Sequence, residues 1–414
     1  MPPRPNKKAT PNGKKPPKKP SIDRKEPAPT TVLDTSNTIP LPLQQLLLNI
    51  FQSALLPNTI VHSDLHDAQN PTPTPTETET ETKTDTLDVK PLIQTLKAHL
   101  YNRDFDAAFT DANDELLRAY ALRWSAARAL GYVGVFKAVL KHLISGQSRS
   151  LARDEGHIVC IGGGAGAEIV ALGGVWRDMA SSSSSSASST STSTSTSTAE
   201  DTEEQGRERT TSPGVTITAV DIADWTSVVH RLNTAMRSGT LRSRSYPPPL
   251  LSPSSSGGDS GGAGQGKFEV AFQRENVLEL ADDQLPRLYN SQGQQWTLVT
   301  LMFTLNELFS TSVAKTTAFL LRTTDAVLPG TYLLVVDSPG SYSSLTVGSS
   351  GERRYPMKFL LDHTLLNVAE GKWEKLVSED SRWWRRDADR LGYDVGGVGL
   401  EDMRFQVHLY RRLA

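Results

Sequence analysis

The sequence predicts an α/β fold built on a mostly parallel β-sheet, and three observations point to it. Short apolar runs typical of buried strands recur within residues 151–414, as HIVCI, VTITAV, FEVAF, WTLVTLM and TYLLVV. Helical patterns at 225–236 and 312–327 lie between them, and this alternation indicates parallel βαβ units. The closing stretch GYDVGGVGLEDMRFQVHLYRR is typical of two strands joined by a short loop, so we expect an antiparallel C-terminal strand.

The chain before residue 92 lacks this alternation. We expect residues 1–40 to be a disordered basic tail, because the first 25 residues hold nine Lys and Arg against the single acid Asp23. Residues 41–91 are expected to form a short amphipathic helix and a polar linker. The helix is predicted from four apolar residues that share one face at helical spacing, Leu43, Leu46, Leu47 and Ile50.

The rest of the chain divides into two parts. Residues 92–150 show a helical pattern and are predicted to form a helical extension. Residues 151–414 are predicted to form the sheet domain, interrupted by two insertions at about 180–213 and 238–266. Both insertions consist mainly of Ser, Thr, Gly and Pro and cannot bury enough apolar surface to order themselves, so we expect disordered surface loops.

Composition narrows the class of protein. The formal net charge is −2, so the chain as a whole has no nucleic-acid signature. The basic tail alone is typical of a nuclear or RNA-binding arm, or of a solvated tail with no specific role.

Cys160 is the single cysteine, which excludes a disulfide framework and a cysteine zinc site. His62 and His66 stand in a polar stretch without further ligands, so no metal site is expected. The longest apolar run, 41–56, is too polar for a membrane span.

A glycine-rich loop follows the first strand-like run and opens a helix. Its glycines let the backbone turn sharply and approach a ligand closely, and the helix start adds free N–H groups. Gly162, Gly164 and Gly166 give the G-x-G-x-G spacing usual for S-adenosylmethionine (SAM) sites. Gly162, Gly164 and Ala167 equally fit the G-x-G-x-x-A form of nicotinamide sites, and a purely structural turn is a further alternative.

Asp221 ends the second strand-like run, where an acid accepts hydrogen bonds from ribose hydroxyls in either kind of site. Such an acid is expected about 20 residues beyond the glycines. Asp221 lies 55 residues beyond Gly166 (221 − 166), and removing the 34 residues of the Ser/Thr insertion leaves 21. The expected spacing is therefore restored when the segment that composition alone marks as an insertion is left out.

Polar residues follow the later strand-like runs, and parallel sheets bind ligands at these carboxyl ends. After the third run, Asn276 or Glu275 is expected to face adenine, with a turn residue as the alternative. After the fourth run, Asn306 and Glu307 are candidates to hold a methyl acceptor, unless they only begin a helix. Asp337 ends the fifth run and either lines the acceptor side or forms a plain turn.

The segment SRWWRRDADR combines two tryptophans with several arginines. Such a combination stacks on bases and neutralises phosphates in RNA-binding proteins. The alternative is that Trp383 and Trp384 are core anchors with the arginines outside.

Several segments together resemble the fungal 25S ribosomal RNA uridine-N3 methyltransferases. They are ELLRAYALRWSAARALGY, HIVCIGGGAGAE, TLMFTLNELF, VVDSPGSYS, SRWWR and LEDMRFQVHLYRR, and they span about residues 92–414 without the two insertions. The resemblance implies a Rossmann-like methyltransferase that uses SAM, acts on large-subunit rRNA or a pre-ribosome, and works in the nucleus or nucleolus, with the cytoplasm left open.

The resemblance also implies roles for individual residues. It assigns cofactor binding to the three loop glycines and Asp221, and implies roles for Tyr120, Arg123 and Trp124, with Arg123 expected at the cofactor. One departure from the general methyltransferase pattern stands out, because Cys160 replaces the acid usually found two positions before the first glycine. Another group must then support the amino group of the methionine moiety.

A mechanism follows as a hypothesis. N3 of uracil carries a proton, so a base within hydrogen-bond reach assists attack on the methyl group. Glu307 and Asp337 are the candidate bases, and Asn306 is a candidate to hold a uracil carbonyl. Because N3 lies on the pairing edge, the target uridine must be unpaired or flipped out. The alternatives are a NAD-dependent oxidoreductase, a non-catalytic ribosome-assembly factor and a methyltransferase for another acceptor.

Overall fold

The computed structural model describes residues 33–56, 87–145, 154–187, 214–241, 247–251, 267–340, 342–346, 352–387 and 389–414. The two histidines considered as metal ligands, most of the basic tail and most of both insertions lie outside these ranges. Within the described residues, no helix combines the length and the apolar character that a membrane crossing requires.

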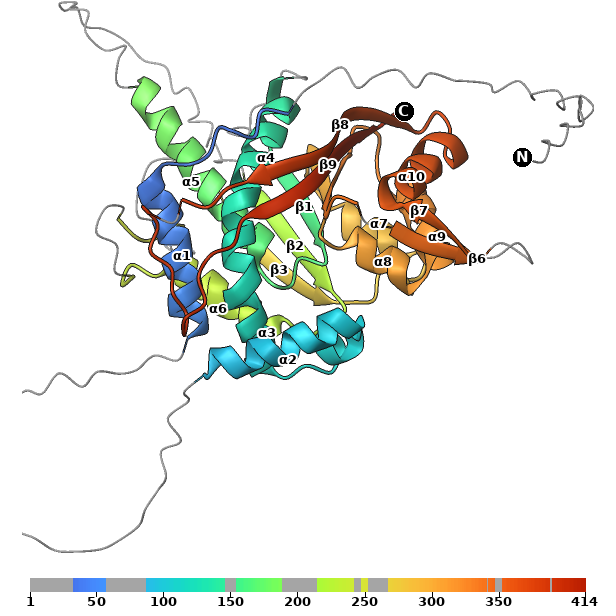
Figure 1. Cartoon of the computed structure of the whole chain (residues 1–414). Helices are drawn as coiled ribbons and strands as arrows, with labels where there is room; N and C mark the ends of the chain where they lie inside the picture. The colour runs from blue at the N-terminus through green and yellow to red at the C-terminus, as the bar shows by residue number, and fades with distance from the viewer. Residues whose placement is uncertain are drawn as a thin grey trace, which may run out of the picture.

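A seven-stranded sheet in the order β3-β2-β1-β4-β5-β9-β8 forms the centre of the molecule (Figure 1). The neighbours from β3 to β5 pair in parallel, whereas β9 runs antiparallel to both β5 and β8. The predicted α/β fold with an antiparallel C-terminal strand is therefore confirmed. The strands are β1 (Gly156–Ile161), β2 (Val215–Asp221), β3 (Phe268–Arg274), β4 (Trp296–Met302), β5 (Tyr332–Asp337), β8 (Trp373–Trp384) and β9 (Met403–Arg412).

Helices cover both faces of this sheet, and the alternation of side chains along each strand divides the core between them. In β1, Ile158 and Cys160 belong to one buried cluster, whereas Val159 and Ile161 belong to the other. The first cluster is shared with α1 (Leu41–Leu55), α4 (Ala126–Ser145), α5 (Ala167–Ala187) and α6 (Thr226–Arg237). The second is shared with α7 (Gln284–Tyr289), α8 (Leu305–Thr311), α9 (Val313–Ala326) and α10 (Met357–Asp362).

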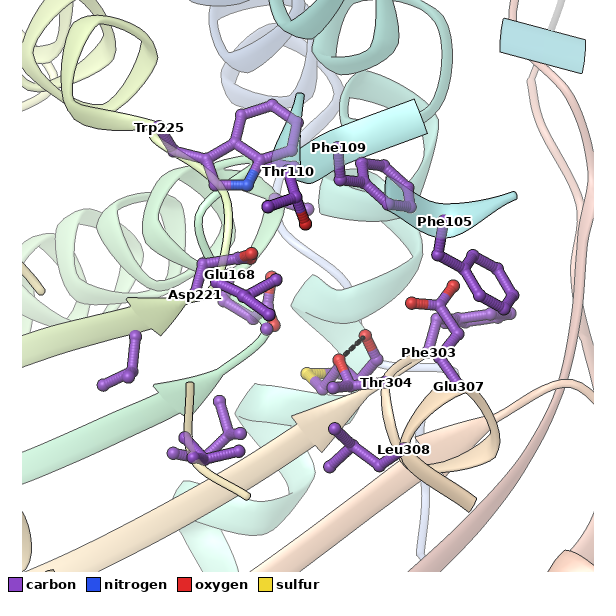
Figure 2. Close-up of a pocket in the computed structure, with 18 of the residues that line it drawn as sticks. Phe105, Phe109, Thr110, Glu168, Asp221, Trp225, Phe303, Thr304, Glu307 and Leu308 are labelled. Atoms are coloured by element: carbon purple, nitrogen blue, oxygen red, sulfur yellow. Dashed lines mark hydrogen bonds between the residues drawn. The ribbon is translucent and has the colours of Figure 1, made fainter. Parts of the chain in front are cut away.

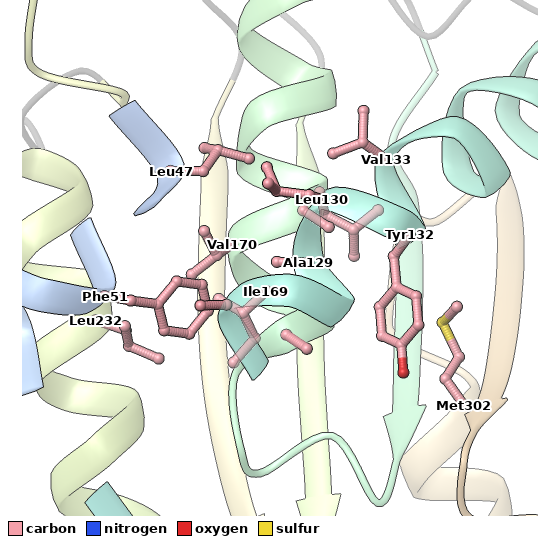
Figure 3. Packing of buried hydrophobic residues seen from close by; sticks show 14 of the residues in the cluster. Leu47, Phe51, Ala129, Leu130, Tyr132, Val133, Ile169, Val170, Leu232 and Met302 are labelled. Carbon is pink, nitrogen blue, oxygen red and sulfur yellow. The ribbon is translucent and has the colours of Figure 1, made fainter. Parts of the chain in front are cut away.

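The helix predicted over 41–56 forms as α1 and is part of the core. The four residues predicted to share its apolar face are all fully buried. Figure 3 shows Leu47 and Phe51 of α1 beside Leu130, Ile169 and Val170 from α4 and α5. Arg118 also fixes the end of α1, because its guanidinium donates to the carbonyl of Leu55 at 2.6 and 2.9 Å.

The described residues between α1 and β1, 87–145, are mainly helical and include two π-helical segments. They contain α2 (Val89–Asn102), η1 (Asp106–Thr110), α3 (Asp114–Tyr120), η2 (Ala121–Ser125) and α4. Asn113 caps α3, because its side chain accepts a hydrogen bond from the amide of Leu116 at 2.9 Å. Figure 1 shows α2 and α3 beside the carboxyl ends of the first strands.

Three segments that were predicted to be disordered contain ordered residues. In the predicted tail, Leu33 and Ile39 are buried in the core. In the first predicted insertion, α5 continues to Ala187, because a helix already begun extends through serines more easily than one begins there. In the second, Leu250 and Leu251 are buried, since these two leucines provide the apolar surface that their polar neighbours lack.

The expectation for the C-terminus is partly wrong. Besides β5, the antiparallel partner of β9 is β8 at Trp373–Trp384, and the stretch GYDVGGVGL forms no strand. Gly396 and Gly397 both have positive φ in this stretch, which breaks an extended run. An element that the sequence did not indicate precedes β8: a hairpin of β6 (Tyr342–Thr346) and β7 (Glu352–Pro356), followed by α10 and η4 (His363–Val368).

Candidate active site

A cavity lies at the carboxyl ends of β1, β2 and β4, and the helical extension forms its opposite wall. Figure 2 shows Asp221, Glu168 and Trp225 toward one end, and Phe105, Phe303 and Glu307 toward the other. The glycine loop after β1 and the residues after β3 complete the lining. The cavity therefore occupies the place where open parallel sheets bind ligands.

The glycine loop is shaped by steric need at each of the three predicted positions. Gly162 and Gly166 have φ of +74° and +83°, a region that favours glycine. A Cβ at Gly164 would overlap the side chain of Trp225, and one at Gly162 would overlap Thr304. With glycine at these positions, the loop backbone lies closer to its neighbours than any other residue type would permit.

Asp221 joins this loop to the end of β2. Its carboxylate accepts hydrogen bonds from the amides of Gly164 (3.1 Å) and Ala223 (3.2 Å), and its backbone carbonyl accepts one from Glu275 (2.8 Å). Burial is the largest influence on this carboxyl group and raises its pKa to about 6, against the lowering effect of these backbone donors. The side chain is half-buried and lines the cavity, so it can accept further hydrogen bonds from a ligand.

Glu168 is a site residue that the sequence analysis missed. It follows the loop at the start of α5, lines the cavity and is only 3 % exposed. Its Oε1 has no hydrogen-bond partner among the described residues, and burial raises its pKa to about 8. An unsatisfied carboxyl oxygen facing a cavity is costly unless a ligand provides a donor or a positive charge. Its position directly after the glycines was the available signal.

The helical extension contributes aromatic and basic side chains to the cavity. Phe105, Phe109 and Tyr120 line it, with the rings of Phe109 and Tyr120 packed edge to face at 5.1 Å between centroids. Arg128 is a second residue that the sequence analysis missed. Its guanidinium donates to the Tyr120 hydroxyl at 2.8 Å and lies 4.7 Å from the centre of the Phe303 ring. The π-helical turns η1 and η2 flank this wall, as such turns often do at functional sites.

Glu307 and Phe303 occupy the far end of the cavity. Phe303 has a φ of +59°, a strained conformation for a bulky residue that is typical of functional sites. Glu307 is half-buried and lines the cavity. Desolvation raises the pKa of its carboxyl group to about 8, and the negative charges of Asp337 and Asp221 add to the increase while Arg128 opposes it.

The structure does not bring the other two predicted catalytic residues into the cavity lining. Asp337 is 2 % exposed and accepts hydrogen bonds from the amides of Asn306 (2.9 Å) and Ser338 (2.7 Å). Burial raises its pKa to about 6. Asp337 therefore fixes the start of α8, which carries Glu307, and Asn306 lies behind the lining rather than in it.

The remaining predicted cofactor residues separate into two groups. Asn276 lines the cavity together with Glu275, and its Oδ1 accepts a hydrogen bond from the amide of Leu278 at 3.1 Å. Arg123 lies outside the lining, because its guanidinium pairs with Glu401 and stacks over Trp124. The arginine in the cavity is Arg128, one turn and a half further along the same helical segment.

The two tryptophans of the SRWWR segment lie in different surroundings. Trp384 packs against the core, whereas Trp383 is 52 % exposed. The guanidinium of Arg385 lies 3.9 Å from the centre of the Trp383 ring and forms an ion pair with Asp402 at 2.6 Å. Arg386 donates to the carbonyl of Leu400. These groups are thus engaged with one another and with the fold.

Comparisons with known proteins identify the family of this chain. A family model of SAM-dependent methyltransferases matches residues 76–411. The 25S rRNA (uridine(2843)-N(3))-methyltransferase of Saccharomyces cerevisiae is 33 % identical over 326 residues, which cover 77 % of this chain and 76 % of the relative.

Solved structures give weaker likenesses. A SAM-dependent methyltransferase from Methanosarcina mazei is 12 % identical, covers 63 % of this chain and 93 % of its own, and has a TM-score of 0.30. An O-methyltransferase family protein from Burkholderia thailandensis is 11 % identical, covers 80 % and 74 %, and has a TM-score of 0.31. The strand order β3-β2-β1-β4-β5-β9-β8 defines the fold. The family match favours SAM over the nicotinamide cofactor that the glycine spacing left open.

Proposed function

The chain belongs to the SAM-dependent methyltransferase family whose model it matches, and we propose that it methylates N3 of a uridine in large-subunit ribosomal RNA. The substrate is inferred from the name of the yeast relative. Within this chain, the observation that supports it most is Glu307, a carboxyl group with a pKa of about 8 beside two aromatic rings at one end of the cavity. This arrangement suits a weakly acidic N–H on a flat base.

The residues around the glycine loop fit SAM. The loop keeps its backbone accessible, and Asp221 is placed to accept hydrogen bonds from ribose hydroxyls. Glu168 has the unpartnered oxygen that suits the positive charge of the cofactor, so it would supply the acid that is absent at Cys160. Asn276 and Trp225 lie near Asp221 in the lining and would contact the adenine. When bound, SAM supplies a methyl group on a positively charged sulfur, which is already activated for transfer.

Glu307 would act as the base for the acceptor. Its carboxylate would take the N3 proton and leave an electron pair on N3 for attack on the methyl group that SAM supplies, with the sulfur of SAM as the leaving group. The proton on Glu307 would then pass to water. Because its pKa is raised to about 8, this carboxylate is a stronger base than an ordinary glutamate.

Phe105 and Phe303 would hold the target base. N3 lies on the pairing edge, so the uridine must be unpaired or flipped out before transfer. Aromatic rings beside Glu307 offer stacking faces for such a base. Asp337 and Asn306 would act through the start of α8, by keeping Glu307 in position.

The proposed RNA substrate implies a binding partner for this protein and a location in the cell. We infer that the protein acts on large-subunit rRNA or on a pre-ribosome, in the nucleus or nucleolus where this RNA is made. The basic residues 4–25 support that location, since clusters of Lys and Arg are typical of nuclear targeting arms.

The acceptor can be tested with methyl-labelled SAM. The purified protein is incubated with unmodified large-subunit rRNA, with small-subunit rRNA and with a protein extract, and the label in each fraction is counted. We expect label in large-subunit rRNA above the other two. Label in the protein fraction alone, or in no fraction although S-adenosylhomocysteine (SAH) binds, would contradict the proposed substrate.

A further inference from the structure

A strip of three aromatic side chains lies on the elements that follow β5, outside the lining of the cofactor cavity. Tyr355, Phe359 and His363 follow one another at four-residue spacing, from the end of β7 through α10 into η4. Their rings stack with interplanar angles of 18° and 2° and centroid separations of 5.4 and 6.0 Å. Contact stacking needs only about 3.5–4 Å, so the rings are offset and each keeps part of its face uncovered.

Phe359 and His363 are exposed in this strip, whereas Tyr355 is partly buried against the core. Packing the ring of Phe359 inward would have removed apolar surface from water, which is favourable. Phe359 is 49 % exposed, and the nearby Val368 is 52 % exposed. The inner face of α10 already supplies Met357, Leu360 and Leu361 to the core. The fold therefore gains no core packing from the outward ring of Phe359, and exposed aromatic groups of this kind are typical of binding surfaces.

The strip borders a second cavity on the same edge of the sheet as the cofactor cavity. This second cavity is lined by Gly340, which follows β5, by Gln406 of β9, and by Lys358, Phe359, His363 and Asp380. Helix α8 lines the cofactor cavity through Glu307 and also packs against β6 and α10. Figure 1 shows the hairpin and α10 next to α8 and α9. A chain that places one base at Glu307 can therefore continue along α8 to this strip.

We propose that Tyr355, Phe359 and His363 form a stacking platform for an unpaired nucleobase that flanks the target uridine. This inference rests on the proposed RNA substrate. Stacked rings suit bases of any identity, because every base has a π-face. Lys358 lies beside the platform in an ion pair with Asp380 at 2.6 Å, and the remaining donors of its ammonium are available to a backbone phosphate. An exposed tryptophan elsewhere, Trp383, lacks this arrangement, since Arg385 already covers its ring.

The test measures the affinity of the full chain for fluorescein-labelled single-stranded oligouridine by fluorescence anisotropy, with SAH titrations as a check on the cofactor cavity. We expect Phe359→Ala to weaken RNA binding by about fivefold or more, and Phe359→Tyr to retain it. SAH affinity is expected to stay unchanged in both variants. The control is Trp383→Ala, which removes an aromatic ring of similar exposure and is expected to bind RNA like the wild type.

Annealing the oligouridine to oligoadenosine should remove the difference between wild type and Phe359→Ala, because paired bases are not free to stack. If the wild type binds single-stranded RNA and Phe359→Ala binds it equally well, the platform is overturned while the proposed function stands. If the wild type binds SAH but no RNA, the proposed substrate fails and the platform fails with it.

Discussion

Three carboxyl groups and one guanidinium are among the charged groups that line the cavity. Glu168, Asp221 and Glu307 have pKa values raised to about 8, 6 and 8, in each case chiefly by burial. Arg128 lowers the pKa of both glutamates by its positive charge, but does not cancel the effect of burial. A ligand that carries positive charge would stabilise the ionised carboxylates, which is the electrostatic requirement that SAM meets.

Glu168→Gln is expected to weaken SAH binding by about tenfold, because it removes a charge-assisted hydrogen bond to the amino group of the ligand. In the wild type, affinity should rise with pH toward about 8, since the carboxyl group must lose its proton to pair with the cation. In the variant this rise should be absent. Calorimetric titration across the pH range measures both effects.

Asp224→Asn is the matched control for that experiment, because Asp224 lies three residues beyond Asp221 and its side chain is 57 % exposed. It should leave SAH affinity unchanged. Equal affinity of Glu168→Gln and wild type at every pH would show that another group holds the amino end of the cofactor.

Glu307→Gln is expected to lower kcat by about 100-fold or more, because it removes the base that takes the N3 proton. SAH affinity should be unchanged. In the wild type, a base works only when deprotonated, so kcat at saturating SAM should rise with pH and level off above about 8. The variant should lack this rise.

The control for this measurement is Glu279→Gln, an exposed acid on the same side of the sheet that pairs with Lys315. It should match the wild type in kcat and in pH profile. If Glu307→Gln retains wild-type turnover, the base lies elsewhere.

At the scale of elements, α1 acts as a structural part of the catalytic domain although it precedes the polar linker. Its buried face packs on α4, α5 and α6, and Gly174 of α5 allows this approach, since a Cβ there would press on Leu47. The helices that α1 contacts include α4, which carries Arg128 into the cavity. We therefore expect the loss of α1 packing to lower the free energy of unfolding directly, and to affect the cavity only through α4.

Leu47→Ala is expected to lower the free energy of unfolding by roughly 2–5 kcal/mol, because Leu47 is fully buried and its truncation leaves a cavity. Thermal unfolding followed by circular dichroism measures the change in Tm. Leu328→Ala, which truncates a leucine that is 55 % exposed, should leave Tm nearly unchanged. An unchanged Tm for Leu47→Ala would mean that α1 is not docked on the domain.

At the scale of the whole molecule, the parts of the fold that repeat a local pattern could be predicted, and the parts that depend on distant contacts could not. The alternation of strand and helix, the loop at Gly162 and the acid at Asp221 all follow from short-range spacing. The partner of β9 lies about twenty residues upstream in β8, and nothing in its sequence marks that pairing. The hairpin and α10 were missed for the same reason.

The residues of the cavity could likewise be predicted only in part. Asp221 and Glu307 were predicted because each ends or follows a strand, where parallel sheets place ligands. Arg128 becomes a site residue only when α4 packs at the strand ends, and Arg123 is directed away by the turn of its helix. Local patterns therefore locate the edge of the sheet that binds the ligand, whereas packing decides which side chains face it.

The most direct test of the proposed function is the identity of the methylated nucleoside. Large-subunit rRNA treated with the purified protein and SAM is digested to nucleosides and analysed by mass spectrometry against standards for N3-methyluridine, C5-methyluridine and 2′-O-methyluridine. We predict N3-methyluridine from the wild type and its loss with Glu307→Gln. A methyl group on any other atom, or N3-methyluridine formed equally by the Glu307→Gln variant, would contradict the chemistry proposed here.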